Sequence, residues 1–365
     1  MSEQQVQEAY LPLLKRLSTG DWFTSRTSAA SLFASVYSRV PASMRTDVHN
    51  MFAMLCHDDT PMVRRATARD MSGLIRHMSK EVVVNDMLPL YRRLSTDDQD
   101  SVRLLTVQDL VAIAEMLTPE ETQQLLLPSI RGVFQDKSWR VRYMAADHFV
   151  KLASAVSESV VHEELVPAYV NLMRDAEAEV RTAGASQTPG LAQLLDQATI
   201  IERLLPVVKE LADDPSQHVR GALAAQVSAL APLLGKDATT EYLLPLFLQL
   251  LKDEYPDVRL NIISRLEQVN EVIGIELLSQ SLLPAIMTLA EDKQWRVRQA
   301  IIENIPLLAH QLGVRFFDEQ LSDLCMSWLG DTVFSIREAA TVNLKKLTEV
   351  FGVQWARTSI IPKVC

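Results

Sequence analysis

The chain has 365 residues, a formal net charge of −10, 48% hydrophobic residues and 6% aromatic residues. This acidic balance argues against a general nucleic-acid-binding surface, which would carry a basic excess, and the short, charge-interrupted apolar runs predict no membrane-spanning helix. The polar N-terminal stretch lacks the features of a signal peptide, and Cys56, Cys325 and Cys365 form no CxxC pair, so we expect reduced thiols and an intracellular protein.

A turn pattern recurs along the whole chain and defines the predicted elements. An Asp is followed six residues later by an Arg, and Val or Ile stands directly before that Arg. The pattern occurs eight times with 39 residues between consecutive Asp residues, and a ninth copy, slipped by one residue, precedes the others. Such regularity indicates a repeat architecture. The predicted turns cover residues 20–26, 58–64, 97–103, 136–142, 175–181, 214–220, 253–259, 292–298 and 331–337.

A proline recurs with the same period in the segment before each turn. On both sides of the turn the apolar residues follow helical spacing, as at Val258, Ile262 and Leu266. Each repeat is therefore predicted to be helix, turn, helix. The proline lies inside the first helix and should kink it, while the Asp closes that helix or caps the next. The prolines are Pro12, Pro89, Pro128, Pro167, Pro206, Pro245, Pro284 and Pro362, with Asn50 and Asp323 in their place in two repeats.

One helix pair cannot bury its apolar face alone, whereas stacked pairs share a continuous core. The predicted fold class is all-α, an α-α superhelix of about nine two-helix repeats of 39 residues, with residues 1–365 forming a single solenoid. We expect the first helices on the convex side, the second helices on the concave side, and the turns as a ridge. The repeated Asp and Arg should bridge adjacent repeats in preference to binding anions, because a guanidinium matches a carboxylate in shape and charge.

Two segments depart from the regular pattern. Thr188, Pro189 and Gly190 stand where a second helix is expected, which leaves the local structure of residues 184–199 open. The chain also stops at Cys365, partway through a predicted first helix and without a polar capping repeat, so we expect an array truncated at this end.

No motif of a known catalytic site is found in the sequence: no phosphate-binding glycine loop, zinc-protease motif or hydrolase nucleophile motif. Cys56 and His57 form the only Cys/His neighbour pair, and no second pair stands at metal-ligand spacing. We therefore expect no catalytic residues, no metal, no cofactor and no small-molecule substrate. These absences indicate a binding protein and not an enzyme.

The third residue after each repeated Asp is a candidate binding position. Because it accepts Asp and Gln it should be exposed, and so should Trp139 and Trp295, which stand beside Arg140 and Arg296. Trp and Arg are enriched at interface hot spots, which favours partner contact over a Trp folded onto its own repeat. Trp22 and Phe23 hold the equivalent turn of the first repeat. The position is occupied by Pro61, Asp100, Trp139, Ala178, Gln217, Pro256, Trp295 and Phe334.

The repeat resembles HEAT repeats, the armadillo-like helical class, and longer stretches resemble one family within it. These stretches are GDWFTSRTSA (20–29), DDTPMVRRA (58–66), DKSWRVRYM (136–144), VRLNIISRL (258–266), NEVIGIELLSQSLLPAI (270–286), WRVRQAIIENIPLLAHQLGVRFFDEQL (295–321) and IREAATVNLKKL (336–347). They are similar to the scaffolding A subunit of protein phosphatase 2A. The resemblance implies a non-catalytic scaffold whose intra-repeat turns bind phosphatase catalytic and variable B-type regulatory subunits.

In that family the N-terminal half holds the regulatory subunit, and the C-terminal repeats hold the catalytic subunit. The family scaffold has more repeats than this chain, so we expect regulatory-subunit binding and weak binding of the catalytic subunit. The resemblance places Trp22, Pro61, Met62, Arg65, Asp100, Trp139, Arg140, Glu177 and Glu179 on the regulatory side, and Trp295, Arg296, Val333 and Phe334 on the catalytic side.

Two other functions compete with this one. Another HEAT adaptor, such as a nuclear-transport factor, is favoured only by the fold and the acidity. A HEAT-like enzyme would need a clustered nucleophile or acid–base set on the concave face, and the sequence shows none. The expected location is the cytoplasm, with the nucleus as a further site, and the sequence does not decide which regulatory subunits bind.

Overall fold

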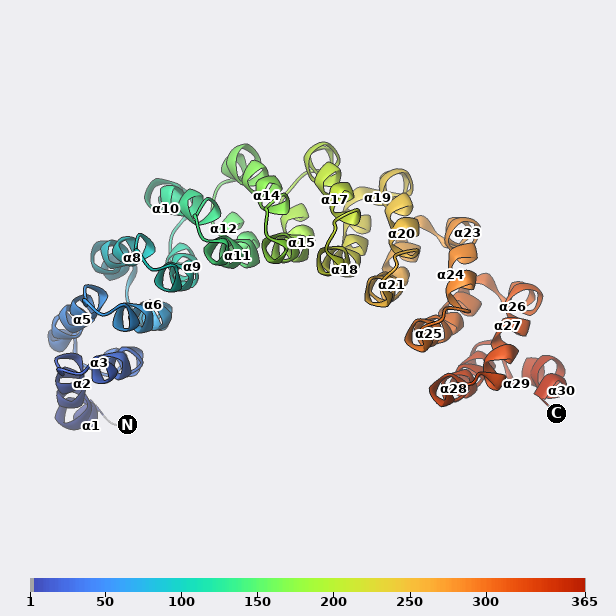
Figure 1. The fold of residues 1–365 in the computed structure, drawn as a ribbon, viewed down its shortest axis with the longest axis horizontal. Helices are drawn as coiled ribbons and strands as arrows, with labels where there is room; N and C mark the ends of the chain where they lie inside the picture. The colour runs from blue at the N-terminus through green and yellow to red at the C-terminus, as the bar shows by residue number, and fades with distance from the viewer. Residues whose placement is uncertain (1–2, 365) are drawn as a thin grey trace. The chain divides into compact units, whose positions relative to one another are not determined.

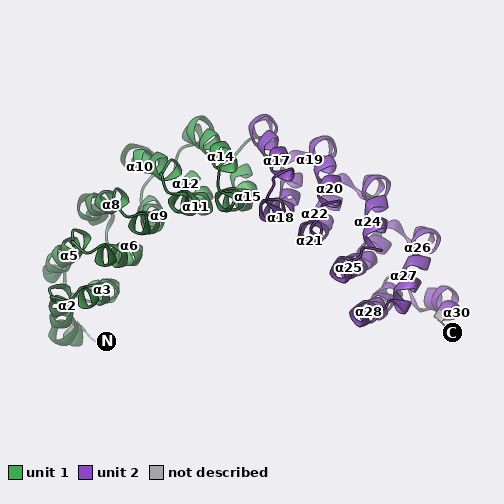
Figure 2. Cartoon of the chain, in the orientation of Figure 1, with its two compact units in different colours: residues 1–195 green, residues 196–365 purple. Residues whose placement is uncertain are grey.

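A computed structural model describes residues 3–364, and every regular element in that range is a helix (Figure 1). The all-α prediction is confirmed. The chain divides into two compact units, residues 1–195 (unit 1) and residues 196–365 (unit 2), which Figure 2 shows in different colours.

Unit 1 is a stack of helix pairs in two layers. Its first-helix segments are α1 (Glu3–Gln5), η1 (Val6–Tyr10) and α2 (Leu11–Ser18); α5 (Ala42–Cys56); α7 (Lys80–Val82), η2 (Val83–Met87) and α8 (Leu88–Ser95); α10 (Pro119–Phe134); and α13 (Glu158–Val160), η3 (Val161–Leu165) and α14 (Val166–Met173). Its second-helix segments are α3 (Phe23–Ala30) and α4 (Phe33–Tyr37), α6 (Pro61–Ile75), α9 (Asp100–Ala114), α11 (Trp139–Asp147) and α12 (Phe149–Ala153), and α15 (Ala178–Ala192). In the second layer α3 packs on α6, α6 on α9, α9 on α11 and α11 on α15 (Figure 1).

Unit 2 repeats the same two-layer arrangement. Its first-helix segments are α16 (Gln197–Thr199), η4 (Ile200–Leu204) and α17 (Leu205–Ala212); η6 (Thr239–Leu243) and α20 (Leu244–Leu250); α23 (Ile275–Leu277), η7 (Leu278–Leu282) and α24 (Leu283–Leu289); and α26 (Val314–Gln320), α27 (Ser322–Ser327) and η8 (Trp328–Gly330). Its second-helix segments are α18 (Gln217–Gln226) and η5 (Val227–Leu230), α21 (Pro256–Ile263) and α22 (Leu266–Ile273), α25 (Trp295–Leu312) and α28 (Phe334–Phe351). The helical segment α19 (Ala231–Ala238) is interrupted at Gly235, where one repeat ends and the next begins, and α29 (Val353–Trp355), η9 (Ala356–Ile360) and α30 (Ile361–Val364) follow α28. The second helices pack in order, α18 on α21, α21 on α25 and α25 on α28.

The core lies between the two layers of each unit. The residue before the repeated Arg begins the buried face of each second helix, and Val63, Val102, Val141 and Val180 are at most 1% exposed. Burying such a side chain stabilises the fold by roughly 1.5–3 kcal/mol. Because the buried position recurs in every repeat, neighbouring pairs share one continuous core, as the periodicity predicts.

The repeated prolines distort the first helix, as predicted, through a π-helical turn. Seven of the prolines stand second in an α-helix, as Pro89 does in α8, and a five-residue π turn directly precedes each of these helices. Proline lacks the N–H of a regular α-helix and its ring clashes with the preceding turn, so the wider π turn makes room for it. Where Asn50 replaces the proline, α5 is a regular helix, and Pro128 is an exception because α10 continues through it.

The junctions between repeats change in kind along the chain. In unit 1 a Ser or Thr with extended backbone begins three of the repeats, as at Thr118, whose hydroxyl caps α10 in a capping box with Glu121. In unit 2 the first repeat begins at Asp196, also with extended backbone, and in the four that follow a glycine with φ between 73° and 91° takes this place, a conformation that only glycine adopts without strain. These glycines are Gly235, Gly274, Gly313 and Gly352, spaced 39 residues apart. This periodic glycine series is present in the sequence but was not part of the prediction.

The segment left open by the sequence is a continuous helix, because α15 runs through Pro189 to Ala192. Pro189 has no N–H to bond to the carbonyl of Ala185, and the hydroxyl of Thr188 donates to that carbonyl instead, at 2.8 Å. Gly190 allows close packing, since a Cβ there would lie 2.8 Å from a methyl group of Val150. The unusual residues therefore adapt the helix to its neighbours without ending it.

Candidate functional site

Each intra-repeat turn is built around the repeated Asp. One carboxylate oxygen accepts the backbone N–H of the residue two positions later, at 2.8–3.0 Å in all eight regular repeats. The second helix begins one residue further on, so the Asp precedes the N-cap by two positions. Of the two expected roles, capping of the second helix is therefore wrong, whereas closing of the first helix is confirmed, since the Asp97 N–H donates to the carbonyl of Leu94 at 3.1 Å. The Asp carboxylate forms an Asx turn that fixes the start of the second helix.

The repeated Arg links each turn to the next one. In unit 1, Arg103 donates to Asp136 of the following repeat through Nε at 2.8 Å and Nη2 at 2.9 Å, and its Nη1 donates to the carbonyl of Asp97 in its own turn at 2.7 Å. The same bridge recurs as Arg26–Asp58, Arg64–Asp97 and Arg142–Asp175 in unit 1, and as Arg220–Asp253, Arg259–Asp292 and Arg298–Asp331 in unit 2. The predicted bridging of adjacent repeats is confirmed within each unit. We call this series the Arg–Asp ladder.

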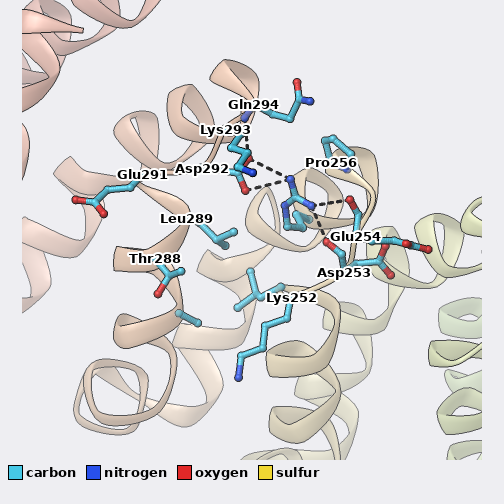
Figure 3. Close-up of a pocket in the computed structure, with 13 residues that line it drawn as sticks. Lys252, Asp253, Glu254, Pro256, Thr288, Leu289, Glu291, Asp292, Lys293 and Gln294 are labelled. Atoms are coloured by element: carbon cyan, nitrogen blue, oxygen red, sulfur yellow. Dashed lines mark hydrogen bonds and ion pairs between the residues drawn. The ribbon is translucent and has the colours of Figure 1, made fainter.

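The ladder satisfies most donors and acceptors of its own charges, although Arg259 reaches Asp292 through Nη2 alone and its buried Nε has no partner. Burial alone would raise the pKa of Asp136, but hydrogen bonds from Arg103 and from the Ser138 backbone outweigh it and hold the pKa below its usual range. Figure 3 shows Asp253 and Asp292 of one such step in unit 2. Arg259 donates to the carbonyl of Asp253 and to the carboxylate of Asp292, beside a hollow of about 630 Å³. A similar hollow of about 650 Å³ lies beside Arg103 and Asp136 in unit 1. Because such hollows occur at the ladder of both units, they follow from the stacking of repeats and mark no special site.

The variable side chains at the turns lie at the first residue of the second helices. Phe334 is 66% exposed, which confirms the expected exposure at this position in one repeat. Trp139 and Trp295 are half-buried, which is less exposure than predicted, and each ring lies close to the guanidinium of the following Arg. The guanidinium carbon lies 5.6 Å from the ring centroid of Trp139 and 4.9 Å from that of Trp295, which is the range of cation–π contact.

The residues predicted for the regulatory side all lie in unit 1. Trp22 is 77% exposed and Met62 51% exposed. Asp100 reaches the next turn, where its carboxylate accepts from the Ser138 hydroxyl at 2.9 Å and lies 3.8 Å from Arg140. The structure thus brings Asp100, Trp139 and Arg140 together. Pro61, Arg65, Glu177 and Glu179 are exposed on other turns of the unit.

The residues predicted for the catalytic side lie on two successive turns of unit 2. Arg296 is exposed and Val333 is half-buried. Sequence reasoning missed Tyr255, which is 39% exposed at the start of α21 with the guanidinium of Arg220 5.5 Å from its ring. Its position, two residues after the repeated Asp, is the signal that would have identified it.

Among residues 3–364, no group of three metal-ligating side chains is close enough to hold a metal ion. Cys56 is buried whereas His57 is exposed and contacts the carbonyl of Ala53, so this sequence pair does not converge on a site. Burial raises the pKa of Cys325 to about 12, and Cys365 lies outside the described residues. No helix in the described range is both long and apolar enough to cross a bilayer.

Comparison with known proteins finds matches over parts of the chain. Family models match residues 126–156 (HEAT repeat), 158–235 (PPP2R1A-like HEAT repeat) and 235–354 (PIK3R4-like, middle domain). The chain is 57% identical over 85 residues to the protein phosphatase 2A scaffold subunit of Dictyostelium discoideum, and 54% identical over 92 residues to the regulatory A subunit of protein phosphatase PP2A of Schizosaccharomyces pombe. These matches cover 23% and 25% of this chain and span only 15% and 16% of the length of the relatives.

Solved structures show similarity over nearly the whole chain. Importin beta matches with a TM-score of 0.65 at 14% identity, covering 97% of this chain and 48% of that one. Kap95p, in a structure with RanGDP, matches with a TM-score of 0.68 at 15% identity, covering 98% of this chain and 49% of that one. At such identity the likeness shows the fold alone. The chain is therefore an all-α HEAT-repeat solenoid with local sequence similarity to the scaffold subunits of protein phosphatase 2A.

Proposed function

We propose that the chain is a non-catalytic scaffold of type 2A serine/threonine protein phosphatase. The observation that carries the proposal is the identity of 54–57% over segments of 85–92 residues to proteins named as scaffold or regulatory A subunits of this phosphatase. HEAT stacking alone requires no such identity, since the structural relatives share the fold at 14–15% identity. The similarity therefore extends to residues that stacking does not dictate.

The intra-repeat turns are the proposed binding surface. The Arg–Asp ladder supplies a fixed frame, and the side chain at the first position of each second helix differs between repeats while remaining accessible. A B-type regulatory subunit would contact unit 1 at Asp100, Trp139 and Arg140, where charged and aromatic groups of two turns meet. The catalytic subunit would contact unit 2 at Trp295, Arg296, Val333 and Phe334. A large half-buried Trp beside an Arg has the composition of an interface hot spot.

The test uses the purified chain and a purified B-type regulatory subunit of protein phosphatase 2A. Titration calorimetry should show saturable binding, and Trp139→Ala should weaken it. The chain alone should show no phosphatase activity, because its described part offers no metal-ligand cluster. Absence of binding, or metal-dependent phosphatase activity in a preparation free of catalytic subunit, would overturn the proposal.

A nuclear-transport adaptor is the second candidate, and the similarity to importin beta and Kap95p favours it. That similarity shows only the fold, whereas the phosphatase scaffolds match at the level of residues. Binding of purified Ran without binding of any phosphatase subunit would favour this alternative. A cytoplasmic location, with the nucleus as a further site, is part of the scaffold proposal and is tested by imaging a tagged chain.

A further inference from the structure

A groove between the second helices α3 and α6 of unit 1 combines cationic and apolar side chains. It has a volume of about 480 Å³, and its lining includes Phe23, Met62, Arg65 and Arg69. Phe23 is 43% and Met62 51% exposed, and both arginines are exposed as well.

The spacing of the two arginines does not stabilise the helix that carries them. Arg65 and Arg69 are four residues apart on α6, and like charges at this spacing repel each other and destabilise a helix. Arg69 is paired with its neighbour Asp70 at 2.8 Å, yet its side chain remains 58% exposed. No described residue forms a hydrogen bond or ion pair with Arg65. The groove therefore presents one guanidinium, that of Arg65, which the fold leaves without a partner, and a second, that of Arg69, which is exposed and shared with Asp70.

The repeat frame does not require this charge, as the equivalent groove in unit 2 shows. Between α25 and α28 the lining includes Glu303 and Glu338, together with Lys346. Glu338 holds the same place in its repeat as Arg65 does in α6, seven residues after the repeated Asp. Two grooves with the same architecture thus carry opposite charge. Positions that vary in charge while the fold stays constant are available for partner selection.

We propose that the groove between α3 and α6 binds an acidic segment of the regulatory subunit, in which two carboxylates flank an apolar side chain. This inference rests on the proposed scaffold function and names the partner chemistry at one of its surfaces. Arginine pairs with a carboxylate through two parallel hydrogen bonds, which gives a fixed geometry as well as attraction. Residues four apart on α6 are about 6 Å apart along the helix axis, and carboxylates four apart on a helix or two apart on a strand have nearly this separation.

Phe23 and Met62 supply the apolar part of the recognition. Methionine is flexible and polarizable, so it adapts to a partner side chain that enters the groove. The volume of about 480 Å³ suits a few side chains of the partner and not a whole helix. The local positive charge also matters at long range, because the chain as a whole carries −10 and would otherwise repel an acidic partner.

The test compares Arg65→Gln/Arg69→Gln in the full chain with a matched control, Glu303→Gln/Glu338→Gln, in the groove of unit 2. A purified B-type regulatory subunit should bind the arginine variant about tenfold more weakly or worse, and its affinity should depend less on salt concentration. The control variant should bind within twofold of the unaltered chain. Circular dichroism should show the same helicity for all three chains. Equal binding of the arginine variant and the unaltered chain would overturn the inference while leaving the scaffold function intact.

A second measurement keeps the inference testable if the regulatory subunit does not bind at all, which would refute the scaffold function. Twelve-residue peptides with Leu flanked by two Glu, by two Gln or by two phosphoserines are titrated onto the full chain by fluorescence anisotropy. The Glu peptide should bind, and both the Gln peptide and the arginine variant should abolish this binding. A phosphoserine peptide that binds more than tenfold tighter than the Glu peptide would overturn the carboxylate assignment, and equal binding of the Gln and Glu peptides would overturn the site.

Discussion

Replacing Asp136 by Ala removes one step of the Arg–Asp ladder in unit 1. Its carboxylate accepts two hydrogen bonds from Arg103, at 2.8 and 2.9 Å, and one from the Ser138 backbone at 2.8 Å. The Arg103 side chain is only 6% exposed, and leaving a buried charge without its partner costs about 3–5 kcal/mol. Arg103 keeps the Asp97 carbonyl as an acceptor, so we expect Asp136→Ala to lower the local stability by about 3 kcal/mol. Asp136→Asn retains an acceptor for the Ser138 N–H, so we expect it to lower the local stability by about 2 kcal/mol.

The effect should be local, because the stability of a repeat array is a sum over repeats and interfaces. Hydrogen exchange followed by mass spectrometry measures it as the free energy of opening of segments 97–103 and 136–142. The control is Asp98→Ala in the neighbouring turn, where the exposed side chain makes no ladder contact and a change within about 0.5 kcal/mol is expected. Equal protection in the Asp136→Ala and Asp98→Ala chains would refute the structural role of the ladder.

The pH dependence of the same variants gives an independent check. Because the pKa of Asp136 is lowered in the folded chain, its stabilisation is fully present above the pKa of an unfolded Asp, about 3.9, and is lost as the pH falls through the lower folded value. The difference in opening free energy between the unaltered chain and Asp136→Asn should therefore shrink on acidification below about pH 4. A difference that stays constant to low pH would contradict the paired state of the carboxylate.

Three further substitutions test other parts of the account. Trp139→Ala should weaken regulatory-subunit binding by about 2 kcal/mol in calorimetry at nearly unchanged helicity, whereas loss of melting temperature and helicity would show that the ring serves its own repeat. Gly274→Ala should destabilise unit 2 by about 2 kcal/mol in hydrogen exchange, because φ at Gly274 is 82°. The control Gly132→Ala lies inside a helix with open space around it and should not destabilise the chain in this way. Equal effects of the two substitutions would contradict the junction geometry. Asp109 is fully buried, and burial raises the pKa of its carboxyl well above the usual range. Because the folded chain favours the protonated carboxyl, the folded state loses stability as the pH rises and the carboxyl ionises. Asp109→Leu should therefore remove a decline in the melting temperature of the chain as the pH rises above the pKa of an unfolded Asp, about 3.9, and a decline that persists would contradict this.

The repeat architecture could be predicted because its determinants are local and periodic. A buried Val or Ile beside the Arg of the eight regular repeats, and an Asp six residues earlier, are visible as spacing in the sequence, and the bridging of Arg and Asp follows from the fit of guanidinium to carboxylate. The continuity of α15 could not be predicted in this way. It depends on the Thr188 hydroxyl, which satisfies the Ala185 carbonyl that Pro189 leaves unbonded, and such a local compensation is apparent only in three dimensions.

The candidate site was predictable in position but not in detail. Spacing located the first residue of each second helix, and its accessibility follows from residues such as Asp100 that share the position. The degree of burial of Trp139 depends on how Arg140 packs against its ring, which no spacing reveals. Phe23, Met62 and Arg65 were candidates from the sequence, but the groove that joins them with Arg69 was not predicted, because it forms only where α3 and α6 pack together.

The scaffold role itself is tested most directly by titrating a purified B-type regulatory subunit of protein phosphatase 2A onto the chain. The account predicts saturable binding with one subunit per chain, weakened at least tenfold in the double variant Trp139→Ala/Arg140→Ala while circular dichroism shows unchanged helicity. Failure of the unaltered chain to bind, or equal binding of the double variant, would contradict a scaffold that works through its intra-repeat turns.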